Sequence, residues 1–375
     1  MRDKVQHSKR RKLLSHAFSQ SNLYECEPLI HKQIEKLITV LQSRIGKPTD
    51  MLNWFRLTAF DVVGELFLGQ SFGGLESGET PQFLSDIELF FILADIQWNY
   101  PWLAIALSWV PLKSVQYFLG AMQRLADYGA KAFNSYVGLY GRESGRKDLL
   151  TKILSVKAET GESQLGDRET SIEIGNLVFA GTVDTTSTTL TFLFWELAKH
   201  QAWQAKLRTE VRAHCGNSPT FQEVQDLPIL EAVIDEALRL HPAAPASLPR
   251  ETPTGGRELN GFFIPEKTIA SMQCYTTHRD PVAFPDPEAF KPERWMEGND
   301  VTTEMKELFM PFSKGSRACI GKNLAMMELK LITARLIKQF KCTVAPVTTE
   351  DSMATMDHFL LIPVGGKCEL IFEVA

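Results

Sequence analysis

A ten-residue stretch, "FSKGSRACIG" (residues 312–321), places a thiol, a cation and two glycines at fixed offsets. An isolated cysteine is usually a small buried hydrophobic residue, and this interpretation applies to Cys319 if its neighbours are ignored. Gly315 and Gly321 let the backbone turn tightly and approach a flat partner closely. Arg317 supplies a cation two residues from the sulfur, and the helical run that follows is expected to lower the thiol pKa through its positive end. Together these features suit a thiolate beside a planar, anionic ligand.

The spacing F-x-x-G-x-R-x-C-x-G, which begins at Phe312, resembles the haem-binding loop of the cytochrome P450 family. The resemblance implies haem b as the cofactor, with Cys319 as the axial thiolate on the haem iron. It also implies haem contacts from Phe312, Gly315, Arg317 and Gly321. A thiolate ligand pushes electron density onto iron and favours cleavage of the O–O bond. The implied activity is that of a haem-thiolate monooxygenase, which inserts one oxygen atom from O₂ into an apolar small molecule.

A second motif, "EALR", places Glu236 and Arg239 three residues apart on one helix face. Taken alone, such a pair is typical of a solvated surface ion pair that contributes little. In the resembled family, however, Glu-x-x-Arg belongs to a buried network that an arginine from a Pro-Glu-Arg segment completes, and "FKPERW" offers Arg294. The resemblance therefore implies a structural triad that supports the cysteine loop and takes no part in the chemistry.

Basic residues in two other segments match positions that bind the haem propionates in this family. Arg250 lies in "LPRETP", and Arg317 lies in the cysteine loop itself. A further contact is expected from a Trp-x-x-x-Arg pattern on an early helix, where "HSKRR" has His7 in place of Trp and keeps Arg11. Histidine can also donate a hydrogen bond to a carboxylate, so the resemblance implies that all four side chains bind haem. The alternative for "KRRK" is a solvated basic run or a nuclear-localisation patch.

The run "AGTVDTTST" resembles the oxygen-activation motif of the family, with Gly181 and Thr182 followed by Asp184 and Thr185. Breaking the O–O bond requires a hydroxyl and an acid that deliver protons. The resemblance implies that Asp184 and Thr185 are this catalytic pair. Thr182 occupies a position where the family usually has glycine and where the helix distorts. A threonine can bond to the carbonyl four residues earlier and bend the helix, which would preserve the distortion.

These motifs must be positioned by a mainly α-helical fold with small β-sheets. Apolar residues recur at helical spacing in three segments, residues 27–45, 121–140 and 227–241. Residues 168–199 are expected to form one long helix. Short strand-like runs broken by Gly and Pro occur later, in residues 258–280 and 358–374. Many helices followed by a few strands exclude an alternating βαβ fold.

The unusually apolar segment of residues 83–112 has two interpretations. It predicts either two helices that cover a core, or a lid over the substrate that also touches a membrane surface. The substrate itself cannot be read from the sequence. Candidate lining residues, each of which could equally be ordinary core, are Phe90, Phe91, Trp98, Val183, residues 243–247 and Phe359.

Length and composition indicate one globular domain over residues 1–375. The 375 residues are 44% hydrophobic and 23% charged, which is enough for a large buried core, and no linker, repeat or low-complexity tract divides them. The net charge of −5 argues against nucleic acid as a partner. Six scattered cysteines without a CxxC pair disfavour a zinc site and a disulfide framework, and suggest a reducing compartment.

The resemblance begins at the third main helix of the family. We therefore expect a cytochrome P450 fold that lacks its N-terminal anchor, its first helices and part of its main sheet, with no transmembrane segment in this chain. For a full-length form, the resemblance implies the cytosolic face of the endoplasmic reticulum membrane and electrons from NADPH–cytochrome P450 reductase. The chain is similar in style to fungal members that modify terpenoids or polyketides.

Two alternatives to a monooxygenase stay open from the sequence. The first is a truncated, non-catalytic product that binds haem or a partner. The second is an isomerase or dehydratase of the same family that uses no external electrons. The presence of both Asp184 and Thr185 argues against the second.

Overall fold

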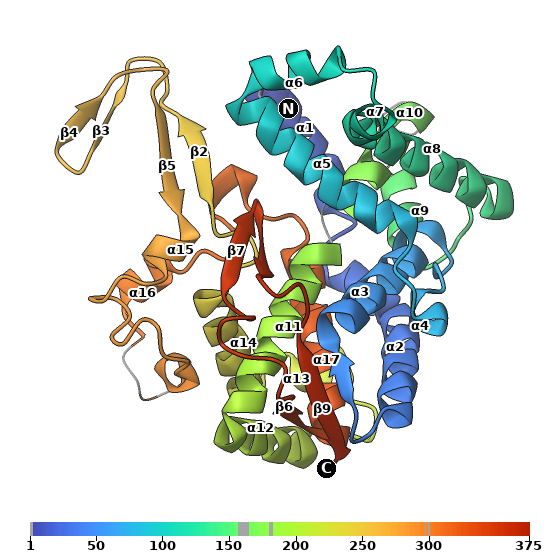
Figure 1. Ribbon diagram of the computed structural model, residues 1–375, viewed down its shortest axis with the longest axis vertical. Coiled ribbons are helices and arrows are strands. Elements are labelled where there is room, and N and C mark those ends of the chain that lie inside the picture. The colour runs from blue at the N-terminus through green and yellow to red at the C-terminus, as the bar shows by residue number, and fades with distance from the viewer. Residues whose placement is uncertain (1–2, 157–164, 180–182, 297, 299–300) are drawn as a thin grey trace.

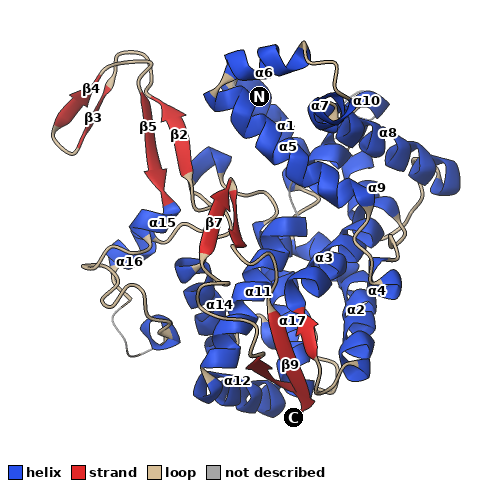
Figure 2. Ribbon diagram, in the orientation of Figure 1, coloured by secondary structure: helices blue, strands red, loops and turns tan. Residues whose placement is uncertain are grey.

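The computed structural model describes residues 3–156, 165–179, 183–296, 298 and 301–375, and α-helices dominate it (Figures 1 and 2). Gly181 and Thr182 of the oxygen-activation motif therefore lie outside the described residues. The helices of the first part are α1 (Lys4–Ser15), α2 (Gln20–Ser43), α3 (Met51–Leu68), α4 (Gly74–Ser77), α5 (Gln82–Asn99), α6 (Pro101–Ser108), α7 (Lys113–Leu119), α8 (Ala121–Tyr140) and α9 (Leu149–Leu154). Those of the second part are α10 (Asp167–Ile174), α11 (Val183–Lys199), α12 (Gln201–His214), α13 (Phe221–Val224), α14 (Pro228–Leu240), α15 (Cys274–Thr277), α16 (Thr303–Leu308) and α17 (Lys322–Gln339).

The strands are short and form four small antiparallel sheets in the described part of the chain. They are β1 (Pro48–Asp50), β2 (Ser247–Glu251), β3 (Arg257–Leu259), β4 (Phe262–Ile264), β5 (Ile269–Gln273), β6 (Phe340–Val344), β7 (Thr355–His358), β8 (Leu360–Pro363) and β9 (Glu369–Val374). One sheet has the order β1-β9-β6, and the others are the pairs β2-β5, β3-β4 and β7-β8. The mainly helical fold with small sheets that the sequence predicts is confirmed.

The segment expected as one long helix over residues 168–199 is helical on both sides of residues 180–182, which lie outside the described residues. Helix α10 ends at Ile174, and Gly175–Phe179 form a π-helical turn before α11 begins at Val183. Helix α8 crosses the end of α10 and this turn closely: a Cβ atom on Gly129 would lie only 2.9 Å from the Ser171 carbonyl oxygen and 3.2 Å from the Gly175 Cα. A π-helical turn inside a helical run often marks a functional site.

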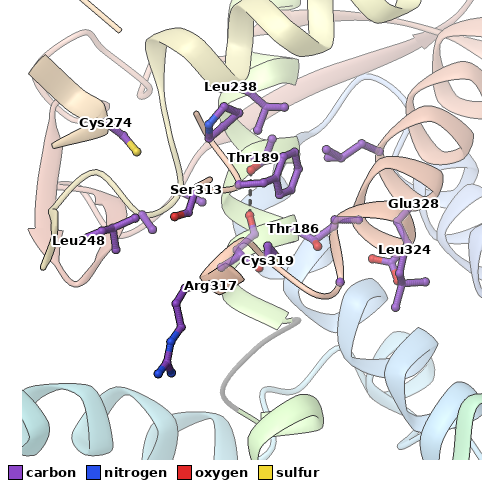
Figure 3. A pocket seen from close by; sticks show the side chains of 18 residues that line it. Thr186, Thr189, Leu238, Leu248, Cys274, Ser313, Arg317, Cys319, Leu324 and Glu328 are labelled. Atoms are coloured by element: carbon purple, nitrogen blue, oxygen red, sulfur yellow. Dashed lines mark hydrogen bonds between the residues drawn. The ribbon is translucent and has the colours of Figure 1, made fainter. Parts of the chain in front are cut away.

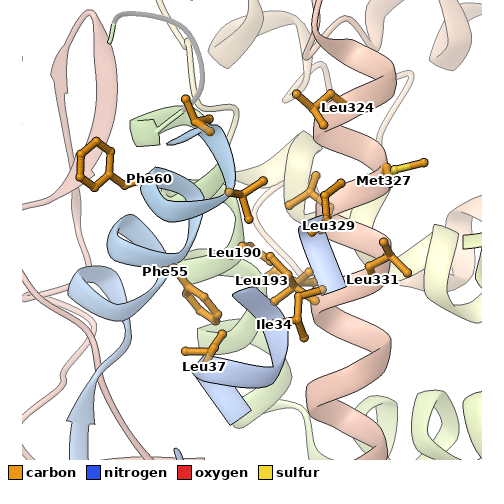
Figure 4. Close-up of a cluster of buried hydrophobic side chains, with 14 of the residues drawn as sticks. Ile34, Leu37, Phe55, Phe60, Leu190, Leu193, Leu324, Met327, Leu329 and Leu331 are labelled. Carbon is orange, nitrogen blue, oxygen red and sulfur yellow. The ribbon is translucent and has the colours of Figure 1, made fainter. Parts of the chain in front are cut away.

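A hydrophobic core joins α2, α3, α11 and α17 (Figure 4). Helix α3 is buried along almost its whole length and packs against α11, where the Phe55 and Phe194 ring centroids lie 5.2 Å apart. Leu190 and Leu193 of α11 and Leu331 of α17 are also fully buried in this cluster. Since the predicted oxygen motif extends into α11 and the cysteine loop leads into α17, this core positions the two motifs relative to each other.

The apolar segment of residues 83–112 forms α5 and α6, and only α5 buries side chains in the core. Ile87 and Leu93 of α5 are buried, whereas no residue of α6 is. Trp102 on α6 is 66% exposed and Trp109, just beyond it, is 83% exposed. The expectation of two helices covering a core therefore fits α5 and fails for α6. Among the described residues, no helix combines the length and apolar character needed to span a bilayer.

Candidate functional site

The cysteine loop lies between α16 and α17, and hydrogen bonds join backbone groups within the loop. The Cys319 N–H donates to the Phe312 carbonyl oxygen at 2.8 Å, and the Ala318 N–H donates to that of Gly315 at 3.1 Å. Gly315 has φ +77°, a left-handed conformation that favours glycine. Gly321 is the residue that precedes the first turn of α17, and a Cβ atom there would lie 3.9 Å from the Cys319 sulfur. Glycine at this position keeps space open beside the thiol.

Cys319 faces a cavity of about 240 Å³ that α11 and α17 enclose together with the cysteine loop (Figure 3). All six cysteines lie in the described segments, and only Cys319 is exposed. Apolar side chains from α14, from the segment after it and from α17 form much of the wall: Leu238, Ala243, Ala244, Leu248, Leu324, Ala325 and Leu329. The cavity thus combines one accessible thiol with a largely apolar surface.

The expected lowering of the Cys319 pKa was wrong for the thiol in this structure. Burial by the surrounding protein raises its pKa, although the N–H groups of Gly321 and Lys322 and the charge of Arg11 act in the opposite direction. Helix α17 does direct its N-terminal N–H groups toward the sulfur, as the sequence predicts. Their effect on the pKa is smaller than the cost of placing a charge in an enclosed site. Metal coordination deprotonates a thiol regardless of this balance.

Of the four basic residues assigned from the sequence, Arg317 belongs to the cysteine loop, and the other three lie on α1 and β2. Arg11 of α1 donates to the Ala318 carbonyl oxygen at 2.6 Å, and Arg250 of β2 donates to the Ser313 hydroxyl at 3.4 Å. Arg317 lines the cavity. Partial burial, followed by the charges of Arg317 and Arg11, lowers the pKa of His7. Positive charge therefore gathers beside the thiol, which suits a ligand that carries carboxylates.

The residues present fit haem by three features of this chain. A single accessible thiol faces the cavity, Gly321 leaves space beside its sulfur, and arginines converge on the same loop. Haem requires these features, because it is a planar ring that holds iron and carries two carboxylate groups.

Glu236, Arg239 and Arg294 are brought together in a buried network. Arg239 donates two parallel hydrogen bonds to the Glu236 carboxylate, both at 2.9 Å, and Arg294 Nε donates to it at 3.0 Å. Two further donors, the Trp295 indole N–H at 2.8 Å and the Lys291 backbone N–H at 2.9 Å, were not anticipated. Glu236 and Arg239 are fully buried. The surface-pair alternative therefore does not describe this pair.

A histidine that the sequence analysis missed links this network to the cysteine loop. His278 Nδ1 bonds to the Arg239 carbonyl oxygen at 3.2 Å, and its Nε2 accepts from the Met310 N–H at 2.9 Å. Burial lowers the pKa of His278 to about 3, so the ring is neutral and one nitrogen can accept while the other donates. Met310 leads directly into the cysteine loop. The triad and the loop are thus joined by a chain of two hydrogen bonds.

Asp184 and Thr185 are neighbours on α11 but have different surroundings. Thr185 lines the cavity, whereas Asp184 is absent from its described lining. The Asp184 carboxylate accepts a hydrogen bond from Arg56 Nε of α3 at 2.8 Å, in an ion pair where both side chains are mostly buried. The sequence analysis missed Arg56, because it lies 128 residues away and no local pattern connects the two.

The candidate substrate residues fall into two groups. Ala243 and Ala244 line the cavity, whereas Phe91 of α5 stacks on Phe359, with ring centroids 5.3 Å apart, and is absent from its described lining. The side chains of Trp98 and Val183 lie outside the described residues.

Comparison with known proteins decides the family. Residues 1–370 match the family model described as "Cytochrome P450". The chain belongs to the cytochrome P450 family. It is 34% identical over 367 residues to the cytochrome P450 monooxygenase tazI of Aspergillus terreus, covering 96% of this chain and 74% of that protein. It is 32% identical to the cytochrome P450 monooxygenase ORF11 of Penicillium roqueforti, covering 90% of this chain and 69% of that protein.

Solved structures confirm the cytochrome P450 fold. The haem domain of cytochrome P450DA superimposes with a TM-score of 0.82 at 20% sequence identity, covering 97% of this chain and 76% of that one. The resemblance inferred from the cysteine loop is therefore confirmed. As a cytochrome P450 monooxygenase, the protein uses haem, O₂, a redox partner and a small-molecule substrate.

Proposed function

We propose that this cytochrome P450 inserts one oxygen atom into an apolar secondary metabolite, a terpenoid or a polyketide, as a single haem-thiolate domain of residues 1–375. The observation that carries the proposal is the accessible Cys319 thiol in a largely apolar cavity that Thr185 also lines. Apolar walls favour an apolar substrate. The named relatives are cytochrome P450 monooxygenases of fungi, which supports a monooxygenase of fungal type.

The residues of the cysteine loop and α1 hold the cofactor in this proposal. When bound, the haem supplies the activation of oxygen. Cys319 is its thiolate ligand, and the propionates are bound by Arg11, Arg250, Arg317 and His7. Phe312, Gly315 and Gly321 shape the surface against which the ring packs. Glu236, Arg239 and Arg294 act through His278 to hold the loop in place.

Thr185 directs a proton into the cavity, and Asp184 acts together with Arg56. The Asp184–Arg56 ion pair ties α11 to α3 next to Thr185. The Asp184 carboxylate accepts a hydrogen bond from Arg56 through one oxygen, so in this proposal Asp184 assists proton delivery as a member of the ion pair.

For the full-length form, we propose the cytosolic face of the endoplasmic reticulum membrane and electrons from NADPH–cytochrome P450 reductase. Exposed apolar side chains support contact with a membrane surface. Trp102, Trp109 and Leu112 lie on or next to α6, and Phe262 and Phe263 lie on β4, toward the same end of the molecule in Figure 1. Aromatic side chains of this kind favour the interface between lipid and water.

Reconstitution tests the proposal. The purified protein should bind haem, give the thiolate-type absorption of the reduced CO complex, and convert a member of a terpenoid and polyketide library in the presence of NADPH and a fungal reductase. Haem binding without NADPH-dependent product would favour the non-catalytic alternative. Product that forms equally well without NADPH would instead favour an isomerase or dehydratase.

A further inference from the structure

Two adjacent arginines on α1 bind in different directions. Arg11 donates to the Ala318 carbonyl oxygen of the cysteine loop at 2.6 Å. Arg10 pairs with two acids of α10 instead: its Nη2 lies 3.2 Å from a carboxylate oxygen of Glu169, and its Nε lies 3.3 Å from one of Glu173. Helix α1 therefore joins the cysteine loop to the helix that precedes the π-helical turn.

The hold of α1 on the hydrophobic core is confined to one end. The structure describes all of Lys4–Ser15, and Leu14 in the last turn is the only buried residue among them. Just beyond the helix, Ala17 and Phe18 are buried, and the Phe18 carbonyl oxygen accepts from the Asn323 amide of α17 at 3.2 Å. The contacts of the middle turn, by contrast, are the polar ones of the two arginines. Segments with few buried apolar contacts open most easily from a folded protein.

Positive charge is concentrated on α1 and on the loop that it contacts. The helix contains no acidic residue and five basic side chains: Lys4, Lys9, Arg10, Arg11 and Lys12. Partial burial, followed by the charges of Arg317 and Arg11, lowers the pKa of His7, so a further cation is disfavoured beside these two arginines. Glu169 and Glu173 of α10 supply the opposite charge. They offset part of the repulsion that arises when α1 lies against the cysteine loop.

The ligand of this site carries charge of the sign that the arginines attract. Haem has two carboxylates, and Arg11 and Arg317 are proposed above to bind them from opposite sides, one on α1 and one on the loop. With the carboxylates between them, attraction replaces repulsion. A ligand that binds one arrangement of a protein better shifts the equilibrium toward that arrangement, so haem binding and the closed position of α1 favour each other.

We propose that Arg10, Glu169 and Glu173 form a latch that holds α1 against the haem site and sets how fast haem is released. Opening of the latch turns α1 about its buried end at Leu14 and withdraws Arg11 from the cysteine loop. The three latch residues touch neither haem nor substrate in this role, so they are positioning residues. The inference rests on the haem contacts proposed above for α1.

The competing explanation is an ion pair that only adds to the general stability of the fold. The Glu169 side chain is 50% exposed, but those of Arg10 and Glu173 are 21% and 13% exposed, so the second pair is shielded from solvent. Burial raises the pKa of Glu173 and the charge of Arg10 opposes this increase, so the carboxylate is stabilised by its partner. A latch changes the opening of α1 alone, whereas a general stabilising pair also changes the opening of the core.

The rate of haem release tests the latch in the haem-loaded protein. Wild type, Arg10→Gln and Lys9→Gln are mixed with excess apomyoglobin, and haem transfer is followed by absorbance. Loss of a shielded, charge-assisted pair should speed transfer from Arg10→Gln by at least about tenfold. Lys9→Gln removes the same charge from the neighbouring exposed side chain, so this matched control should release haem at the wild-type rate. The thiolate-type absorption of the reduced CO complex should be the same in all three proteins.

Hydrogen exchange locates the motion. In haem-loaded Arg10→Gln, the amides of α1 should exchange faster than in wild type, whereas those of α3 and α17 should keep their wild-type rates. The double variant Arg10→Glu with Glu173→Arg restores the pair with opposite polarity, so it should release haem more slowly than either single variant. Unchanged haem release from Arg10→Gln, equally faster exchange in α1 and the core, or a double variant no slower than the single ones would each overturn the inference.

A further variant, Arg11→Gln, separates this inference from the proposed function. Fast haem release from Arg11→Gln together with wild-type release from Arg10→Gln would overturn the latch and leave the haem contacts proposed for α1 intact. Wild-type protein that acquires no haem would contradict the proposed function, and the latch would fail with it.

Discussion

Replacing Glu236 with glutamine should remove the centre of the network behind the cysteine loop. Five N–H donors converge on this carboxylate. Its Oε1 accepts from Arg239 Nη2, Arg294 Nε and the Lys291 backbone N–H, and its Oε2 accepts from Arg239 Nε and the Trp295 indole. An amide can accept at only one of these two positions and must direct its NH₂ group at donors in the other. The substitution also leaves two guanidinium groups without their counter-charge.

The expected cost follows from the burial of the network. Glu236 and Arg239 are fully buried, and the Arg294 side chain is 9% exposed. Removing one partner from a buried ion pair costs about 3–5 kcal/mol. That is a large part of the roughly 5–15 kcal/mol that holds a typical domain folded. Because His278 connects Arg239 to Met310, the loss should also release the cysteine loop and with it the haem.

The assay is urea unfolding followed by far-UV circular dichroism, together with haem content per polypeptide. Asp286→Asn is the control, since it breaks the nearby Lys291–Asp286 pair, whose members are both exposed. Asp286 has φ +51°, a conformation that asparagine tolerates well, so the control should change neither measurement. If Glu236→Gln retained haem and unfolded within about 1 kcal/mol of wild type, the reasoning about a buried network would be refuted.

Three further predictions concern the cavity. Cys319→Ser should abolish the thiolate-type absorption of the reduced CO complex, whereas Cys274→Ala, in the same cavity wall, should keep it; a thiolate spectrum in the serine variant would contradict the assignment. Thr185→Val should keep haem but raise the share of NADPH electrons that leave as peroxide, and proton delivery typically contributes about a hundredfold. An unchanged product yield per NADPH would mean that Thr185 is ordinary helix. Burial raises the pKa of Glu328, which lines the cavity from α17, to about 8, so the folded protein binds one proton more than the unfolded chain between about pH 4.5 and 8. Stability therefore falls over this range as the pH rises, on the order of 5 kcal/mol at most. Glu328→Gln should remove this slope from urea unfolding, and parallel slopes in both proteins would argue against a buried acid.

The spacing of apolar residues within one segment correctly predicted helices that form from that segment alone. The run of residues 121–140 is helix α8, and residues 227–241 contain α14 within one residue at each end. The π-helical turn at Gly175–Phe179 was missed, and it lies where α8 approaches closely at Gly129, a contact between distant segments. The exposure of α6 was missed for the same reason, since apolar content does not reveal whether a neighbour covers a helix.

The site shows the same division between local and long-range causes. The spacing around Cys319 led to the cytochrome P450 family, because the loop geometry is encoded within ten residues. The direction of the Cys319 pKa shift was wrong, because the sequence reveals the nearby N–H groups but not the burial that outweighs them. The partner of Asp184 was also invisible, because Arg56 comes from another helix. A sequence signal for Glu328 did exist, as a lone acid within the apolar run "NLAMMELKL".

The arrangement of the core separates the chemistry from substrate selection. Cys319 lies three residues before the start of α17, and Glu328 lies on α17 itself, while Thr185 and Thr186 share α11. Both helices are packed into the central hydrophobic cluster, so the core holds the thiol, the acid and the hydroxyls in a fixed relation. The parts that contact the core least are different. Helix α6 buries no side chain, and Phe359, with its left-handed φ of +72°, stacks on the ring of Phe91 of α5. Substitutions in this outer layer can alter which molecule enters without disturbing the proton and thiolate positions, so selection for new substrates should act on α5, α6 and the β7-β8 turn rather than on α11 or α17.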